Sequence, residues 1–155
     1  MLMEVLIAQL KKRGHIVAAI KHCSHGHQVD RRGKDSQRMQ AAGADTILMS
    51  SPGMVTVIRN VAEEPDLVEL IKILDSNYDI VLVEGYKTSP AFKIVVSLEG
   101  EDAPDDADLS SVLANVRPVV GGDGIPYFPT ELVTWLVSSI ESNFIPAKTL
   151  LGDIS

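Results

Sequence analysis

Apolar residues recur at helical spacing at both ends of the chain. At the start, Leu2, Leu6 and Leu10 fall on one face of a helix, and Gly14 follows as a stop. Near the end, Thr130 is a residue that commonly caps a helix, and an apolar stripe follows it. The stripe consists of Leu132, Val133, Leu136, Val137 and Ile140. We therefore predict an opening helix over residues 2–13 and a closing helix that begins at Thr130.

Between these helices, short runs of apolar residues have the length and composition of buried strands. The runs that we interpret in this way are Ile16–Ile20, Thr46–Met49, Ile80–Val83, Phe92–Leu98 and Arg117–Val120. Residues 55–61 alternate as a half-exposed strand does. Further helices are expected after Lys34, after Pro65 and over residues 109–113. Strands that alternate with helices predict an α/β fold, with a mostly parallel sheet covered on both faces in three layers.

Length and charge narrow the function classes. A chain of 155 residues is the usual size of one domain, which we place at residues 1–145 with a tail at 146–155. The net charge of −7 disfavours non-specific binding to nucleic acid or to an anionic membrane. The single cysteine, Cys23, excludes an internal disulfide, and no apolar run reaches the length of a membrane span. We expect a cytoplasmic protein.

Polar residues follow the predicted strands at the edge of the sheet where ligands bind in open parallel sheets. Lys21 to His27 follow one strand, Glu84 to Lys87 follow another, and Asp123 closes the last. A carboxylate held at the end of a buried strand can bind Mg²⁺ or orient a water molecule beside a phosphate. Glu84 fits that role, with a turn that merely points it to solvent as the alternative.

Two lysines and a run of histidines are further candidates. Lys21 and Lys34 can contact phosphate oxygens, or they can simply be solvated. All four histidines lie near Cys23, which would suit zinc, but the paired spacings of a zinc site are absent. The residues from Glu99 to Asp108 are rich in acids and predict either a solvated loop or a docking surface for a basic partner.

These motifs resemble the MobB family, adaptor proteins of molybdopterin-guanine dinucleotide biosynthesis. The first motif runs from Lys21 to Ala44 and includes Gly33-Lys34-Asp35-Ser36, and the second is Val81 to Lys87. The third, Val119 to Asp123, is similar to the family's last strand. The likeness covers residues 2–140 and implies a P-loop NTPase-like, GTP-binding fold, usually a homodimer. It implies Mg²⁺ as well, with weak GTP hydrolysis at most.

The resemblance implies roles for individual residues and for partners. Glu84 would be the catalytic, magnesium-side carboxylate, with Asp30 as a second metal candidate, and Asp123 would read the guanine edge. Nucleotide-phosphate or pterin contacts would come from Lys21, His22, His25, Lys34, Asp35, Ser36, Gly85 and Lys87. Asp35 and Ser36 can instead cap a helix that Gly43 ends. The expected partners are a MobA-type guanylyltransferase and molybdopterin or its carrier enzymes.

One departure from the family pattern leaves a second function open. The glycine-lysine loop of P-loop proteins, with the strand before it, is absent from the sequence, and the opening helix aligns with the helix that should follow that loop. We therefore expect an N-terminally truncated version of the fold, whose central strand is missing and whose neighbouring strands lose a partner. The alternative is a non-catalytic interaction module that binds a partner or a metal ion and has lost nucleotide binding.

Overall fold

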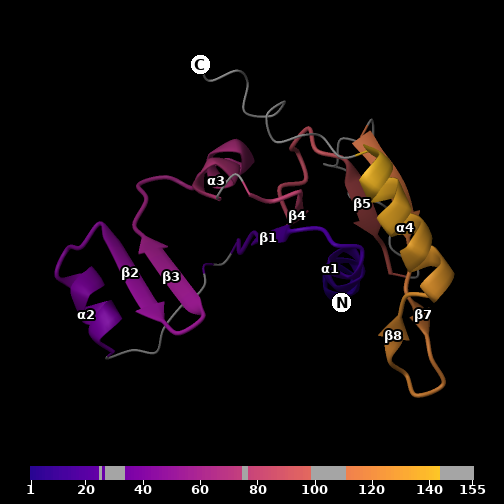
Figure 1. The fold of residues 1–155 in the computed structure, drawn as a ribbon, viewed down its shortest axis with the longest axis horizontal. Coiled ribbons are helices and arrows are strands. Elements are labelled where there is room, and N and C mark those ends of the chain that lie inside the picture. Colours follow the sequence, from indigo (N-terminus) through magenta and orange to yellow (C-terminus); the bar gives the residue numbers. More distant parts are fainter. Residues whose placement is uncertain (25, 27–33, 75–76, 99–110, 144–155) are drawn as a thin grey trace. The chain divides into compact units, whose positions relative to one another are not determined.

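The computed structural model describes residues 1–24, 26, 34–74, 77–98 and 111–143 (Figure 1). Its helices are α1 (Leu2–Lys12), α2 (Asp35–Ala41), α3 (Leu67–Ile73) and α4 (Thr130–Asn143). Its strands are β1 (Val17–Lys21), β2 (Thr46–Ser51), β3 (Met54–Arg59), β4 (Ile80–Glu84), β5 (Lys93–Val96), β6 (Val112–Val116), β7 (Val119–Val120) and β8 (Pro126–Tyr127). Within these residues, no helix combines the length and the hydrophobicity that crossing a bilayer requires.

The chain divides into two compact units. The larger unit consists of Met1–His22 and Leu67–Ser155, and the smaller unit is Cys23–Asp66. Each is described by itself below. The assignment of residues 1–145 to one domain stays a prediction, and the predicted tail at 146–155 lies outside the described residues.

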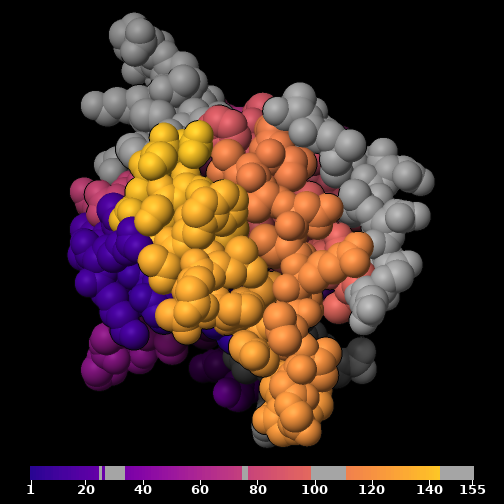
Figure 2. All heavy atoms as spheres, turned by 90° about the vertical axis from the view of Figure 1, so that its right-hand side faces the viewer, coloured from indigo at the N-terminus to yellow at the C-terminus, as the bar shows by residue number. Residues whose placement is uncertain are grey.

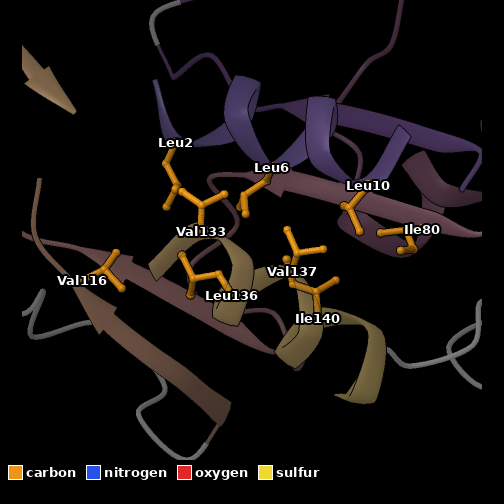
Figure 3. Packing of buried hydrophobic residues seen from close by; sticks show 9 residues of the cluster. All are labelled: Leu2, Leu6, Leu10, Ile80, Val116, Val133, Leu136, Val137 and Ile140. Atoms are coloured by element: carbon orange, nitrogen blue, oxygen red, sulfur yellow. The ribbon is translucent and has the colours of Figure 1, made fainter. Parts of the chain in front are cut away.

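The core of the larger unit is the contact between its first and last helices. Leu6 and Leu10 of α1 face Val133, Leu136 and Val137 of α4 (Figure 3). The rest of this cluster consists of Leu2, Ile80, Val116 and Ile140. α1 and α4 also lie side by side at the surface (Figure 2). The apolar stripes that predicted both helices are therefore the faces that meet, and burial of those side chains drives the contact.

The strands of the larger unit form three pairs. β1 pairs with β4 and β5 pairs with β6, both in parallel, whereas the short β7 and β8 pair antiparallel. The all-apolar run at residues 80–83 was predicted as a buried strand, and it forms β4 beside α1, with Ile80 in the core cluster. Parallel pairs packed against helices confirm the α/β prediction.

Two predictions about residues 109–120 were wrong. Val112 and Leu113 begin strand β6 instead of ending a short helix, while residues 109–110 lie outside the described part. The strand expected over Arg117–Val120 is interrupted, because Pro118 has no N–H to donate to a ladder. What remains is β7, whose two valines are exposed. The paired strand is instead β6, whose last residue, Val116, is buried.

The smaller unit is an antiparallel hairpin with one short helix. β2 and β3 pair in full register from Thr46 opposite Arg59 to Ser51 opposite Met54. Pro52 and Gly53 make the turn, with Gly53 at φ +77°, and proline followed by glycine is the preferred pair for a type II turn. Ile47 is buried, whereas Leu48 on the opposite face is exposed. The prediction that both faces of residues 46–49 are buried was therefore wrong.

Helix α2 begins one residue earlier than the predicted caps imply, and it ends where the sequence predicted. Its N-cap is Lys34, so Asp35 and Ser36 lie inside the helix and neither caps it. The Asp35 Oδ1 atom accepts a hydrogen bond of 2.9 Å from the Ser36 N–H. The predicted stop at Gly43 is confirmed: Gly43 has φ +100°, and the N–H groups of Gly43 and Ala44 donate to Gln40 and Met39.

Glu141 links the end of α1 to α4. Its Oε1 lies 2.8 Å from His15 Nε2, and its Oε2 accepts from Arg13 Nη1. The hydrogen bond from His15, with a smaller contribution from Arg13, lowers the pKa of Glu141 below its ordinary value. A lowered pKa adds stability above the ordinary glutamate value of about 4.3, and this stability is lost as the pH falls through the lowered pKa.

We therefore expect Glu141→Gln to lower the unfolding midpoint at neutral pH and to make the midpoint depend less on pH under acidic conditions. Thermal unfolding of the wild type and the variant, followed by circular dichroism from pH 7 to pH 3, measures the effect. The difference between their midpoints should be largest at neutral pH and should shrink as the pH falls. Glu131→Gln, at an exposed position in the first turn of α4, is the control. Parallel profiles for wild type and Glu141→Gln would contradict the assignment.

Candidate functional site

Lys21 and Glu84 meet at the carboxyl ends of the paired strands β1 and β4. They are register partners, and Lys21 Nζ lies 2.9 Å from Glu84 Oε1. The side chains are 59% and 42% exposed, and an ion pair in that setting is worth at most about 1 kcal/mol. The sequence placed both residues at this edge, and the structure brings them together. Because the pair is weak, another cation or anion can replace either partner at little cost.

His22 and Gly85 extend this pair by one residue on each strand. The N–H of His22 donates to the Glu84 carbonyl oxygen over 2.9 Å, which continues the ladder past the end of β1. Gly85 has φ +97°, and a Cβ at this position would lie 2.5 Å from the Cβ of His22. The close approach of the two backbones therefore requires glycine at residue 85.

Tyr86 is a site residue that the sequence analysis did not select. Its φ of +50° is left-handed, and its ring centroid lies 5.1 Å from that of His22. A bulky residue in this conformation is strained, and such strain is concentrated at functional sites. An aromatic residue directly after a glycine at the end of a strand was the available signal. Lys87 follows it with an exposed side chain.

Lys93 fixes the far end of the loop that Glu84 begins, and the sequence analysis also missed it. Its Nζ donates to the carbonyl oxygens of Ser89, at 2.6 Å, and Ala91, at 3.2 Å. It also donates to Ser111 Oγ at 2.7 Å, just before β6. All three acceptors are neutral. Nothing in the sequence distinguishes this partly buried lysine from a surface lysine at the start of a strand.

Asp123 belongs to the turn between β7 and β8. Its Oδ1 accepts a hydrogen bond of 3.0 Å from the N–H of Ile125 and lies close to Gly121. This contact stabilises the turn, as aspartate does in many tight turns. Among the described residues, the contacts of Asp123 are with its own turn, and its role at the guanine edge stays a prediction.

The remaining predicted residues lie in the smaller unit or outside the described part. Lys34 caps α2, Asp35 is its first residue, and Ser36 is buried on it. His25 and Asp30 lie outside the described residues. Among the residues that are described, no group of three or more histidine, cysteine, aspartate or glutamate side chains is arranged to hold a metal ion.

Comparison with known proteins identifies the family. The profile described as "Molybdopterin guanine dinucleotide synthesis protein B", MobB, matches residues 1–117. The chain belongs to the MobB family. This confirms the resemblance drawn from the motifs at residues 21–44 and 81–87, both of which lie inside the matched region.

Curated MobB relatives are similar over part of their length. The molybdopterin-guanine dinucleotide biosynthesis adapter protein of Haemophilus influenzae is 36% identical over 96 residues, which are 61% of this chain and 54% of that protein. The protein of the same name from Escherichia coli is 36% identical over 102 residues, 64% of this chain and 58% of that protein. The chain thus spans little more than half the length of the curated relatives it matches.

Solved MobB structures share the fold. A crystal structure of molybdopterin-guanine biosynthesis protein B has a TM-score of 0.63 and 26% identity, and the match covers 91% of this chain and 89% of that chain. A MobB homologue from Bacillus stearothermophilus has a TM-score of 0.57 and 22% identity, with coverage of 92% and 89%. The prediction of the P-loop NTPase-like α/β fold is therefore confirmed.

Proposed function

We propose that this protein is a GTP-binding adaptor in molybdopterin-guanine dinucleotide biosynthesis and assists a MobA-type guanylyltransferase. The observation that carries the proposal is the Lys21–Glu84 pair at the carboxyl ends of two parallel strands, in a chain of the MobB family. Molybdopterin, or the enzymes that carry it, is the further partner. We propose that the protein acts in the cytoplasm.

At the carboxyl ends of β1 and β4, the carboxylate of Glu84 suits Mg²⁺ and the ammonium group of Lys21 suits a phosphate oxygen. Mg²⁺ usually keeps several waters and takes one or two carboxylates together with the phosphates of its nucleotide. Glu84 offers one such carboxylate, and the weak pairing with Lys21 leaves it able to exchange partners. Lys21 would then turn to a phosphate oxygen. Bound Mg²⁺ would neutralise phosphate charge, and Glu84 would orient water beside it.

Replacing Glu84 with glutamine tests this proposal. The amide keeps the size of the side chain but removes the charge that attracts Mg²⁺, so we expect affinity for Mg²⁺-GTP to fall by at least about tenfold. Titration with a fluorescent GTP analogue in the presence of Mg²⁺ measures the affinity. Lys34→Ala should weaken binding as well, because it removes a predicted phosphate contact.

Glu131→Gln is the matched control, since it removes an exposed carboxylate in the first turn of α4. It should bind the analogue like the wild type. If the wild type fails to bind the analogue at any usable concentration, the nucleotide part of the proposal is wrong for this protein, and the alternative of an interaction module without nucleotide takes its place.

The adaptor role also requires protein partners, and the smaller unit offers a surface that suits one. Leu48 lies opposite Val57 in the hairpin register, and both side chains are exposed on the face away from Ile47, as is Val55. Exposed apolar sheet faces of this kind are typical of interfaces. We propose that this face supports a homodimer.

Sedimentation velocity tests both the homodimer and the complex with a guanylyltransferase. The wild type alone should sediment as a dimer, and Leu48→Lys, which places a charge on the exposed face, should shift it to the monomer. Addition of a MobA-type guanylyltransferase should give a larger complex that Mg²⁺-GTP strengthens. A monomeric wild type would contradict the dimer, and no complex with the enzyme would contradict the adaptor role.

A further inference from the structure

Lys93 is the first residue of β5, and its side chain turns back to the loop at residues 85–92 that joins β4 to β5. The Nζ atom donates to the carbonyl oxygens of Ser89, at 2.6 Å, and Ala91, at 3.2 Å, and to Ser111 Oγ, at 2.7 Å. An ammonium group has three N–H donors, so these contacts use its whole hydrogen-bonding capacity. One cation therefore ties the loop to itself and to the residue before β6.

The charge of Lys93 makes these contacts strong. A hydrogen bond with one ionised partner is roughly twice as strong as a bond between two neutral groups. Among the residues that the structure describes, the ion pairs do not include Lys93. The side chain is partly buried, and burying a charge is costly unless hydrogen bonds compensate it. The position of this ammonium group is therefore set by the loop carbonyl groups and the Ser111 hydroxyl group that surround it.

A continuous set of contacts joins Lys93 to the ends of β1 and β4. Ser89, whose carbonyl oxygen accepts from Lys93, donates its own N–H to the Tyr86 carbonyl oxygen over 3.0 Å, as in a four-residue turn. The ring centroid of Tyr86 lies 5.1 Å from that of His22. The N–H of His22 donates to the Glu84 carbonyl oxygen. Lys93 is thus connected through the loop to the candidate site.

The conformation of Tyr86 depends on being held. Its φ of +50° is left-handed, directly after Gly85 at φ +97°. A residue with a bulky side chain keeps such a conformation only where the surrounding structure imposes it. The hydrogen bond from Ser89 imposes it on one side, and Lys93 fixes Ser89 in turn. If Ser89 is released, we expect Tyr86 to relax to a negative φ and its ring to leave His22.

We propose that Lys93 is a positioning residue for the candidate site at the carboxyl ends of β1 and β4. It fixes the Ser89 carbonyl group, which holds the turn that begins at Tyr86 and keeps the Tyr86 ring against His22, beside Glu84. Lys93 acts through the loop and not on a ligand. The consequence for nucleotide binding rests on the proposed function, whereas the effect on the loop does not.

Lys93→Met tests the effect on the loop, because methionine keeps most of the length of the side chain and removes its donors. Amide hydrogen exchange at Ser89, read by NMR, should become at least about tenfold faster. The nuclear Overhauser effect between the rings of Tyr86 and His22, expected in the wild type, should disappear. Lys93→Arg keeps the charge and N–H donors, although in a planar arrangement, and should lie closer to the wild type in both measurements.

Core amides and a second lysine provide the controls. Exchange at Leu10 and Leu136, which are 0% exposed in the cluster between α1 and α4, should not change in Lys93→Met. Lys72→Met removes an exposed lysine from α3 in the same unit and should change neither the loop nor the core. A change at Ser89 without a change in the core distinguishes positioning of the loop from a general contribution to stability.

Titration with the fluorescent GTP analogue in the presence of Mg²⁺ tests the consequence for the site. Lys93→Met should weaken binding by about three- to thirtyfold, the range for residues that influence a site without contacting its ligand. Lys93→Arg should recover part of this loss, and Lys72→Met should bind like the wild type.

Three results would overturn the proposal. Unchanged exchange at Ser89 in Lys93→Met would show that Lys93 does not hold the loop. Faster exchange throughout the core would show that its role is general stability. Equal binding of the analogue by the wild type and Lys93→Met would show that the loop does not position the site, while the proposed function would stand. If the wild type does not bind the analogue, the proposed function fails, and the exchange and the ring contact still decide whether Lys93 holds Tyr86 against His22.

Discussion

Replacing Gly85 with alanine is expected to lower the free energy of unfolding of the larger unit by about 3 kcal/mol. Two causes add. The residue sits at φ +97°, where an L side chain is strained by about 1–2 kcal/mol, and the new Cβ would lie 2.5 Å from the Cβ of His22. The Cβ of His22 is fixed to the backbone and cannot rotate away. The backbones that follow β1 and β4 must therefore move apart.

Urea unfolding followed by tryptophan fluorescence measures this loss. Trp135 is the single tryptophan of the chain and lies on α4, so it reports on the larger unit. Gly124→Ala is the control, because Gly124 has a similar φ of +78° in the same unit but nothing within 4 Å of a Cβ. It should cost only the strain, about 1 kcal/mol.

A double variant separates the clash from the strain. His22→Gly removes the Cβ that the alanine would meet, so His22→Gly combined with Gly85→Ala should lose less than the sum of the two single changes. An additive result would show that the backbones at residues 22 and 85 do not pack as described. Loss of the Lys21–Glu84 contact should accompany Gly85→Ala, because that contact lies one residue away on each strand.

The parts of the fold that the sequence predicted are those whose patterns are set by burial on one face. The stripe of Leu2, Leu6 and Leu10 predicted α1, because all three side chains lie in the core cluster. Of the run that predicted β4, Ile80 lies in the same cluster. The hairpin face at Leu48 was mispredicted for the converse reason. An apolar run predicts cover on both faces, but the run itself carries no information about whether the chain supplies that cover.

At the candidate site, the sequence predicted positions better than contacts. The sequence placed Lys21 and Glu84 at the same edge of the sheet, since parallel strands end there, but the pairing of their two strands is known from the structure. The left-handed conformation of Tyr86 and the three neutral acceptors of Lys93 depend on tertiary packing, which no local pattern encodes. The hydrogen bond of Asp123 within its turn could be predicted from the neighbouring glycines, and its role at the guanine edge, implied by the family likeness, stays a prediction.

Replacing Leu136 with alanine is expected to have the largest effect of any single substitution considered, about 3–5 kcal/mol. Leu136 is 0% exposed and lies in the cluster between α1 and α4 (Figure 3). The truncation removes the transfer free energy of the buried carbons and leaves a cavity between two helices that are joined through the core. Because the contact of α1 with α4 holds the chain's first and last described elements together, the whole larger unit should respond.

The same fluorescence-detected urea unfolding measures this loss, with Leu98→Ala as the matched control. Leu98 belongs to the same unit but is 55% exposed, so an identical chemical change should cost less than about 1 kcal/mol. Equal losses at the two positions would mean that the α1–α4 contact is not the core of the unit.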